Sequence, residues 1–157
     1  MRLKAILRTA LMLGSVTAAL VTGTNAAQAA PGDGTWWKDY QTGRCLDGNL
    51  VSSTMFTSAC QGQYSQDWQF VSIGGGYIHV VNDLATGENR CMTTNGSTVW
   101  RIYCGHNPTG SSQRWTLINT SYGLMFKSDD GRCLESNSAG GVYMNACNSV
   151  NRYQSWH

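Results

Sequence analysis

The sequence contains no Cys-x-x-Cys pair and no segment with sustained helical periodicity. Structural zinc sites usually take their cysteines from such close pairs, so the six cysteines are not predicted to bind a metal. Without an apolar repeat of 3.6 residues, a helical domain is not expected either. Gly, Ser and Asn interrupt the chain every few residues, which favours an all-β protein built from short strands.

The chain also has no basic excess once its N-terminus is set aside. Residues 1–29 are predicted to be a secretory signal peptide, because Arg2, Lys4 and Arg8 precede an apolar stretch that ends at the small residues Ala27-Gln28-Ala29. The apolar stretch is short for a membrane anchor. Its removal takes away three of the eleven Lys and Arg residues and none of the nine Asp and Glu residues, leaving a charge of −1. Binding to nucleic acid or insertion into a membrane is therefore not expected.

A catalytic constellation is not evident in the sequence. His79, His106 and His157 have no recognisable Ser or Cys nucleophile in context. Asp129 and Asp130 are adjacent in a predicted turn, where they could not face a substrate from two sides. The protein is predicted not to be an enzyme, and no cofactor or metal is expected.

Six cysteines in a short secreted chain predict three disulfides. The sequence alone leaves fifteen pairings open. The cysteines, however, occur as three pairs separated by 15, 13 and 14 residues. One disulfide within each pair gives Cys45–Cys60, Cys91–Cys104 and Cys133–Cys147.

Each cysteine pair is followed by a Gln-x-Trp motif, and the three tryptophans are 47 and 41 residues apart. The motifs are Gln66-Asp67-Trp68, Gln113-Arg114-Trp115 and Gln154-Ser155-Trp156. A unit of forty-odd residues therefore occurs three times, and such internal repeats decide the architecture. We assign residues 30–35 to a short lead-in, residues 36–157 to one domain, and its repeats to about 36–72, 73–118 and 119–157.

Each repeat is predicted to contain four short strands, the first of them over residues 36–40. A propeller of four-stranded units needs at least about four blades. Three units can instead form one barrel with pseudo-threefold symmetry, closed by a layer of hairpins. The predicted fold is the all-β β-trefoil, with Trp68, Trp115 and Trp156 at equivalent places in a shared core.

Three cysteine pairs in register with three Gln-x-Trp motifs resemble the ricin-type β-trefoil lectin family, which also occurs as a carbohydrate-binding module of secreted glycosidases. The resemblance covers residues 36–157 and implies one sugar pocket per repeat. Each pocket would hold a carboxylate two residues after the first cysteine, two contacts four and two residues before the second cysteine, and the motif glutamine with the residue before it.

The resemblance carries these roles to three sets of residues. The first pocket would comprise Asp47, Phe56, Ser58, Ser65 and Gln66. The second would comprise Thr93, Trp100, Ile102, Ser112 and Gln113. The third would comprise Glu135, Tyr143, Asn145, Tyr153 and Gln154. A carboxylate accepts charge-assisted hydrogen bonds from sugar hydroxyls, and an aromatic ring covers the apolar face of a pyranose.

This chain departs from the family pattern at two positions. The stacking ring that usually stands two residues before the second cysteine is replaced by Ser58, Ile102 and Asn145, and an aromatic residue lies two positions earlier in every repeat. The residue before the motif glutamine is Ser or Tyr, where the family usually has Asn. Thr93 replaces the carboxylate of the second pocket, which is therefore predicted to be inactive.

Other interpretations remain open for these residues. The motif glutamines could serve only to tie the backbone of each repeat together, and Asp47 could be a turn-forming residue. Glu135, which is one methylene longer, is more readily a solvated surface charge than Asp47 is. We expect a secreted, extracellular, monomeric module that binds carbohydrate. The alternatives are a protein-binding trefoil, such as a protease inhibitor acting through the loop at residues 105–110, and a module whose pockets have all decayed.

Overall fold

The computed structural model describes residues 34–49, 51–82, 89–105 and 110–157, and these are almost entirely β-structure. The predicted signal peptide lies outside the described residues, as do residues 106–109 of the candidate inhibitory loop. Within the described part of the chain, no helix combines the length and the apolar character needed to cross a membrane. The strands are β1 (Cys45–Asp47), β2 (Phe56–Ser58), β3 (Trp68–Gly74), β4 (Tyr77–Asn82), β5 (Arg90–Thr94), β6 (Val99–Tyr103), β7 (Trp115–Thr120), β8 (Gly123–Ser128), β9 (Arg132–Ser136) and β10 (Val142–Ala146).

One layer of the fold is a barrel built from antiparallel hairpins. Strand β3 pairs with β4 and β7 pairs with β8, while Ile78 of β4 pairs with Trp115 of β7. The two ends of the domain complete this layer through isolated bridges, which are Thr35 with Trp68, Asp39 with Trp156, and Leu124 with Trp156. These bridges join the two ends of the domain to the hairpins and so close the layer.

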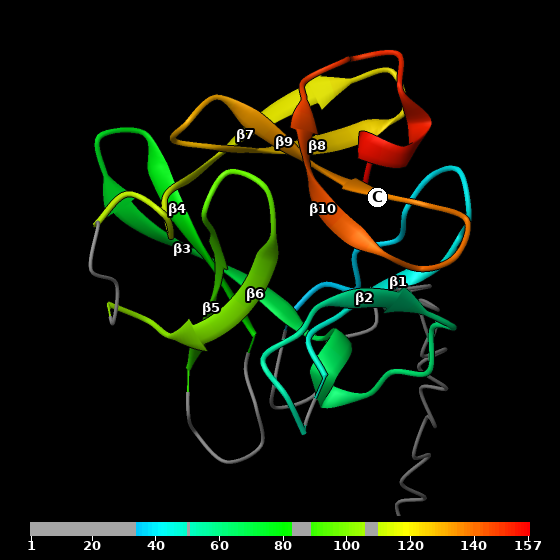
Figure 1. Ribbon diagram of the computed structural model, residues 1–157, viewed down its shortest axis with the longest axis horizontal. Coiled ribbons are helices and arrows are strands. Elements are labelled where there is room, and N and C mark those ends of the chain that lie inside the picture. Colours follow the sequence, from blue (N-terminus) through cyan, green and yellow to red (C-terminus); the bar gives the residue numbers. More distant parts are fainter. Residues whose placement is uncertain (1–33, 50, 83–88, 106–109) are drawn as a thin grey trace, which may run out of the picture.

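Three further hairpins, β1–β2, β5–β6 and β9–β10, form the second layer and lie together near the centre of Figure 1. Each touches the other two through a single bridge. The bridges are Thr54 with Trp100, Phe56 with Gly141, and Thr98 with Tyr143. The triangle of hairpins covers one end of the barrel and gives the predicted β-trefoil, so the prediction of the fold is confirmed.

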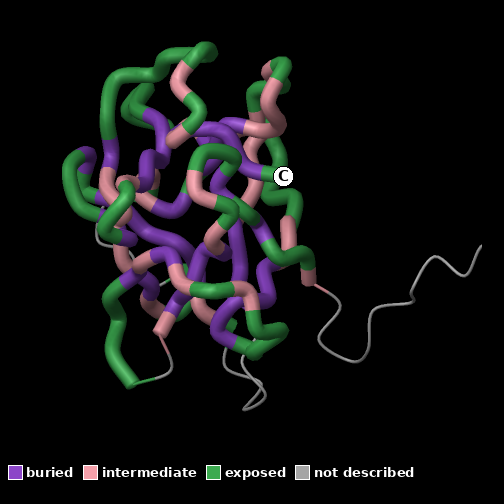
Figure 2. The backbone as a smooth tube through the Cα atoms, turned by 90° about the vertical axis from the view of Figure 1, so that its right-hand side faces the viewer, coloured by how far each residue is buried: buried purple, intermediate pink, exposed green. Residues whose placement is uncertain are grey.

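The core lies between the barrel and the hairpin layer, where the buried stretches of the strands converge (Figure 2). The residue after the first cysteine of each pair is fully buried there, as Leu46, Met92 and Leu134. The three motif tryptophans are at most 1% exposed. Their indole Nε1 atoms donate to the carbonyls of Leu46, Met92 and Leu134, at 3.0, 2.9 and 3.5 Å. Packing and hydrogen bonding thus repeat with the threefold pattern.

The three predicted disulfides are present as Cys45–Cys60, Cys91–Cys104 and Cys133–Cys147. Each fastens the outer end of its own hairpin, and none joins two repeats. In the chain-entropy model, a loop of this size contributes roughly 3 kcal/mol to stability.

The prediction of a strand at residues 36–40 is wrong. This segment makes only isolated bridges, because Lys38 and Asp39 pair with the ends of other segments. The motif glutamines also precede their strands: Gln66 ends the 3-10 turn η1 (Tyr64–Gln66), and Gln154 ends η2 (Arg152–Gln154). These turns redirect the chain so that each glutamine points into its own repeat while the tryptophan two residues later enters the core.

A buried arginine links the first two repeats. Arg101 is 2% exposed although it stands three residues before Cys104, where the other repeats have Thr57 and Met144. Its guanidinium donates to Asn82 Oδ1 at 2.8 Å and to the carbonyl of Asn49. Burial lowers the pKa of Arg101, the charge of Arg90 lowers it further, and the charge of Asp47 opposes both.

Arg101→Ala should lower the free energy of unfolding by about 2–4 kcal/mol, because it leaves a cavity and removes the donors from two acceptors. Chemical denaturation measures this loss. Arg114→Ala is the matched control, since its side chain is 47% exposed and 3.9 Å from Asp129. A surface pair of this kind should contribute less than about 1 kcal/mol. Equal losses in the two variants would contradict the role of Arg101 as a link.

Candidate functional site

Each motif glutamine makes the same pair of hydrogen bonds to the backbone of its repeat, which we call the glutamine clamp. Every Oε1 accepts the backbone N–H of the residue after the second cysteine, namely Gln61, Gly105 and Asn148, at 2.9, 2.9 and 2.8 Å. Every Nε2 donates to a carbonyl at the end of the hairpin, in Ala59, Tyr103 and Ala146, at 2.8, 3.2 and 2.8 Å. The glutamines therefore do tie each repeat together. They also hold the residue at the carboxylate position, as the three pockets show in turn.

In the first repeat, Asp47 lies at the centre of the predicted residues. Its Oδ2 accepts Ser58 Oγ at 2.9 Å and lies 3.2 Å from Gln66 Nε2. Its Oδ1 accepts the backbone N–H of Asn49 at 3.0 Å, so Asp47 also forms the turn suggested by its sequence context. The side chain is only 5% exposed. Asp47, Ser58 and Gln66 thus form one hydrogen-bonded group at the end of β1.

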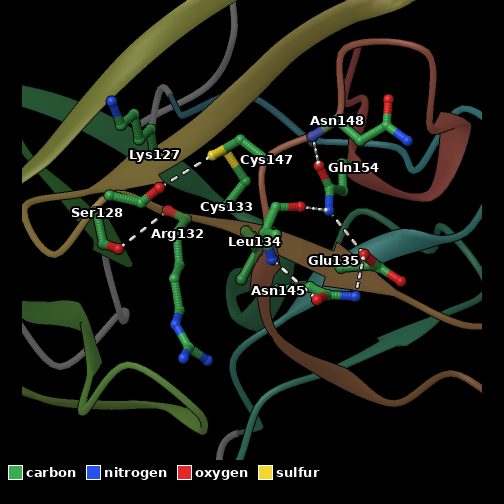
Figure 3. Close-up of a disulfide and its surroundings, with 12 residues drawn as sticks. Lys127, Ser128, Arg132, Cys133, Leu134, Glu135, Asn145, Cys147, Asn148 and Gln154 are labelled. Atoms are coloured by element: carbon green, nitrogen blue, oxygen red, sulfur yellow. Dashed lines mark hydrogen bonds between the residues drawn. A yellow bond between two sulfur atoms is a disulfide. The ribbon is translucent and has the colours of Figure 1, made fainter.

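In the third repeat, Glu135 accepts four hydrogen bonds (Figure 3 shows those from Asn145 and Gln154). Its Oε1 accepts Tyr143 Oη at 2.9 Å. Its Oε2 accepts Asn145 Nδ2 at 3.1 Å, Asn151 Nδ2 at 3.2 Å and Gln154 Nε2 at 2.7 Å. Burial raises the pKa of the Tyr143 phenol, and the hydrogen bond to Glu135 and its charge raise it further, so Tyr143 stays a donor.

The structure does not support the alternative interpretation of Glu135 as a solvated surface charge, because the residue is 8% exposed and its carboxylate accepts hydrogen bonds from four donors. Its carboxylate also accepts a hydrogen bond from Asn151, a partner that the sequence interpretation missed. Asn151 caps η2 by accepting the backbone N–H of Tyr153 at 3.0 Å. An Asn three residues before the motif glutamine was the available signal, since Asn favours such caps. Tyr153 itself is half-buried, and its interaction with Tyr143 also raises the pKa of that phenol.

In the second repeat, Thr93 takes the place of the carboxylate. Its hydroxyl accepts Gln113 Nε2 at 3.1 Å and donates to the carbonyl of Cys91 at 2.9 Å, and the residue is 1% exposed. Thr93 therefore completes the glutamine clamp but brings no charge. A cavity of about 410 Å³ opens beside it and is lined by Trp100 and Ile102, among other residues.

The aromatic residue four positions before the second cysteine has the same place in all three repeats. Asp47 pairs across the strands with Phe56, Thr93 with Trp100, and Glu135 with Tyr143. Residues paired in this way share one face of the hairpin. Each ring is half-buried and stands beside its carboxylate or hydroxyl position. The structure thus brings a ring, a polar clamp and, in two repeats, a carboxylate together at the end of each hairpin.

The described residues bring one group of three metal-ligating residue types together, namely His79, Cys91 and Cys104, whose ligand atoms lie within 4.8 Å of one another. Both cysteines form a disulfide, so they cannot act as thiolate ligands. Burial lowers the pKa of His79, which favours the neutral ring. This group is best explained by packing against the disulfide.

The model of the ricin-type β-trefoil lectin domain matches residues 37–156. The chain belongs to the ricin-type β-trefoil lectin family. The match spans all three repeats, including every residue of the three glutamine clamps. It confirms the resemblance drawn from the cysteine pairs and Gln-x-Trp motifs. No curated protein sequence matches the chain significantly.

Solved structures share the fold of this lectin-family chain at low sequence identity. The match to the designed threefold-symmetric protein ThreeFoil has a TM-score of 0.64 and a sequence identity of 18%. It covers 77% of this chain and 94% of ThreeFoil. The match to SeviL bound to asialo-GM1 saccharide has a TM-score of 0.61 and a sequence identity of 15%. It covers 77% of this chain and 91% of the SeviL chain. A GlcNAcα1-4Gal-releasing endo-β-galactosidase from Clostridium perfringens has a TM-score of 0.65 and 14% identity over 78% of this chain but only 31% of its own. The chain thus spans about a third of that enzyme.

Proposed function

We propose that the protein is a secreted, monomeric carbohydrate-binding module without enzymatic activity, which binds sugars through shallow surface pockets at the ends of its hairpins. We assign binding first to the pockets of the first and third repeats. The observation that carries this proposal is the buried carboxylate held by the motif glutamine in both repeats, Asp47 by Gln66 and Glu135 by Gln154.

The hydrogen bonds from the described residues use only part of the acceptor capacity of each carboxylate. An ionised carboxylate offers about four acceptor positions. Glu135 Oε1 accepts Tyr143, and Asp47 Oδ1 accepts the N–H of Asn49. Each of these oxygens therefore keeps a position for a sugar hydroxyl, while the glutamine holds the other oxygen still. Such preorganisation reduces the entropy cost of binding.

Secretion is supported by the three disulfides, because such bonds persist in oxidising compartments. Sugar binding is supported by membership of a lectin family and by the saccharide bound to SeviL, a protein of the same fold. The glutamine-held carboxylates give that support a physical basis in this chain, since they are the groups that a sugar hydroxyl would meet.

A glycan array on the protein consisting of residues 30–157 tests the proposal. We expect binding to a defined set of glycans that free sugar competes away. A protease-inhibition assay on the same sample serves as the counter-test. Inhibition without any glycan binding would overturn the proposal and favour the protein-binding alternative.

Asp47→Ala should weaken binding at the first pocket by roughly tenfold to a hundredfold, since a hydrogen bond to a charged group contributes about 1.5–3 kcal/mol. Gln66 keeps its contacts to Ser58 Oγ and Ala59 O, so the variant should still fold. Calorimetry with a sugar identified on the array measures the change. Thr93→Ala is the matched control, because this hydroxyl belongs to the second repeat and is used within it, so its loss should leave affinity at the first pocket unchanged. Parental affinity of the Asp47 variant at every site would show that the assigned pocket is wrong.

A further inference from the structure

The cavity of about 410 Å³ in the second repeat lies between two repeats. One wall comes from the β5–β6 hairpin and includes Thr93, Trp100 and Ile102, the positions that hold Asp47, Phe56 and Ser58 in the first repeat. The opposite wall is the turn between β8 and β9 in the third repeat, with Asp129 and Asp130. A volume of this size is within the usual range of small-ligand sites, about 300–1,000 Å³.

Asp130 presents a carboxylate oxygen to this cavity. Its Oδ1 is held within the turn by the backbone N–H of Arg132 at 3.2 Å and by the hydroxyl of Ser128. Its Oδ2 points across to the hairpin, since a Cβ placed on Gly96 would come within 2.5 Å of it. Gly96 has a φ of +88°, which together with this close approach requires glycine. The third repeat thus places an oriented, exposed carboxylate at Gly96, in the wall of the cavity that Trp100 also lines.

Asp129 also lines the cavity, but unlike Asp130 its carboxylate interacts with side chains outside it. Its Oδ2 lies 3.9 Å from Arg114 Nη1, and its hydrogen bond and charge raise the pKa of Tyr77. Asp129 is therefore partly neutralised and shared with residues outside the pocket. Asp130 is the carboxylate better placed to accept hydrogen bonds from a ligand.

We propose that this cavity is a saccharide site in which Asp130 of the third repeat supplies the carboxylate that the second repeat lacks. The ring of Trp100 covers the apolar face of a pyranose, and Asp130 Oδ2 accepts its hydroxyl groups. Two carboxylates and no basic side chain line the cavity among the described residues, which favours neutral or amino sugars and disfavours uronic acids, because like charges repel. This inference rests on the proposed function and extends it, and it revises the expectation that the second pocket is inactive.

NMR titration of the 15N-labelled protein tests the site locally. The indole signal of Trp100 is assigned by its loss in Trp100→Phe. The probes are lactose, xylobiose and N,N′-diacetylchitobiose as neutral sugars, glucosamine as a cationic sugar and galacturonic acid as an anionic one. We expect at least one neutral or cationic probe to shift the Trp100 signal, and galacturonic acid to leave it unchanged at the same concentration.

Two conservative variants separate the aspartates. Asp130→Asn keeps an oxygen for the turn and should weaken the binding reported by Trp100 at least tenfold. Asp129→Asn is the matched control and should weaken it clearly less. An unchanged melting temperature in both variants shows that the turn is intact.

Three results would overturn the inference. Probes that shift the side-chain amides of Asn145 and Asn151 but not the Trp100 indole would reject this cavity and leave the proposed function standing. Probes that shift no signal anywhere would reject both. Parental affinity of Asp130→Asn at the Trp100 signal would also reject the role of the carboxylate.

Discussion

Trp115→Ala should lower the free energy of unfolding by about 3–5 kcal/mol, as expected for a large aromatic side chain removed from a core. Trp115 is fully buried, and its indole donates to the carbonyl of Met92 at 2.9 Å. The variant therefore leaves both a cavity and a buried acceptor without its donor. Because the tryptophan belongs to the core shared by all three repeats, the loss should appear as one cooperative shift in chemical denaturation.

Trp36→Ala is the matched control for this result, because it removes the same side chain from a position that is 48% exposed. Its cost should be well below that of Trp115→Ala. A loss below about 1 kcal/mol in the Trp115 variant would show that the ring does not support the core. Separate unfolding transitions would contradict a single shared core.

Glu135→Ala should weaken sugar binding at the third pocket and also destabilise the fold. Glu135 accepts hydrogen bonds from Tyr143, Asn145, Asn151 and Gln154, and Gln154 is buried. A buried donor without its acceptor costs about 1–3 kcal/mol. Removal of the charge should also weaken binding at this pocket by roughly tenfold to a hundredfold. Denaturation and calorimetry measure the two effects separately.

Glu135→Gln distinguishes the charge from the volume of the side chain. It fills the same space but turns an amide toward side chains that are themselves donors. We expect a loss of affinity close to that of Glu135→Ala with a smaller cavity effect on stability. A Gln variant that binds sugar like the parent would show that the negative charge has no part in binding.

The repeat pattern alone was enough to predict the fold and the disulfides. Three cysteine pairs of nearly equal spacing, each followed by Gln-x-Trp, allow one arrangement in which equivalent residues occupy equivalent places. The equivalence holds in detail, since each glutamine binds the N–H after its second cysteine and each tryptophan donates to a core carbonyl. The spacing of residues within a repeat predicts these contacts because each motif glutamine forms its hydrogen bonds within its own repeat.

The resemblance to the lectin family, rather than the repeat pattern, named the candidate residues of the first and third pockets, but not their hydrogen bonds. Spacing places Glu135 beside Tyr143 and Gln154, because cross-strand partners follow from the hairpin register. The burial of Glu135 is compatible with its charge because four donors surround the carboxylate. One of these donors, Asn151, lies in a loop, and the periodicity of the sequence does not predict the course of a loop. Single-residue spacing does not determine the course of such a loop.

The sequence by itself determined the three repeats, their disulfides, the buried tryptophans and the hairpin positions of the candidate pocket residues. These features depend on contacts within one repeat, and each repeat contains the residues that make those contacts. Only the tertiary structure decided how one repeat faces the next. It placed Arg101 of the second repeat against Asn49 of the first, and Asp130 of the third against Gly96 of the second, in a cavity that Trp100 also lines. Such contacts depend on the closure of the barrel and the hairpin triangle, which brings together side chains that are far apart in the chain.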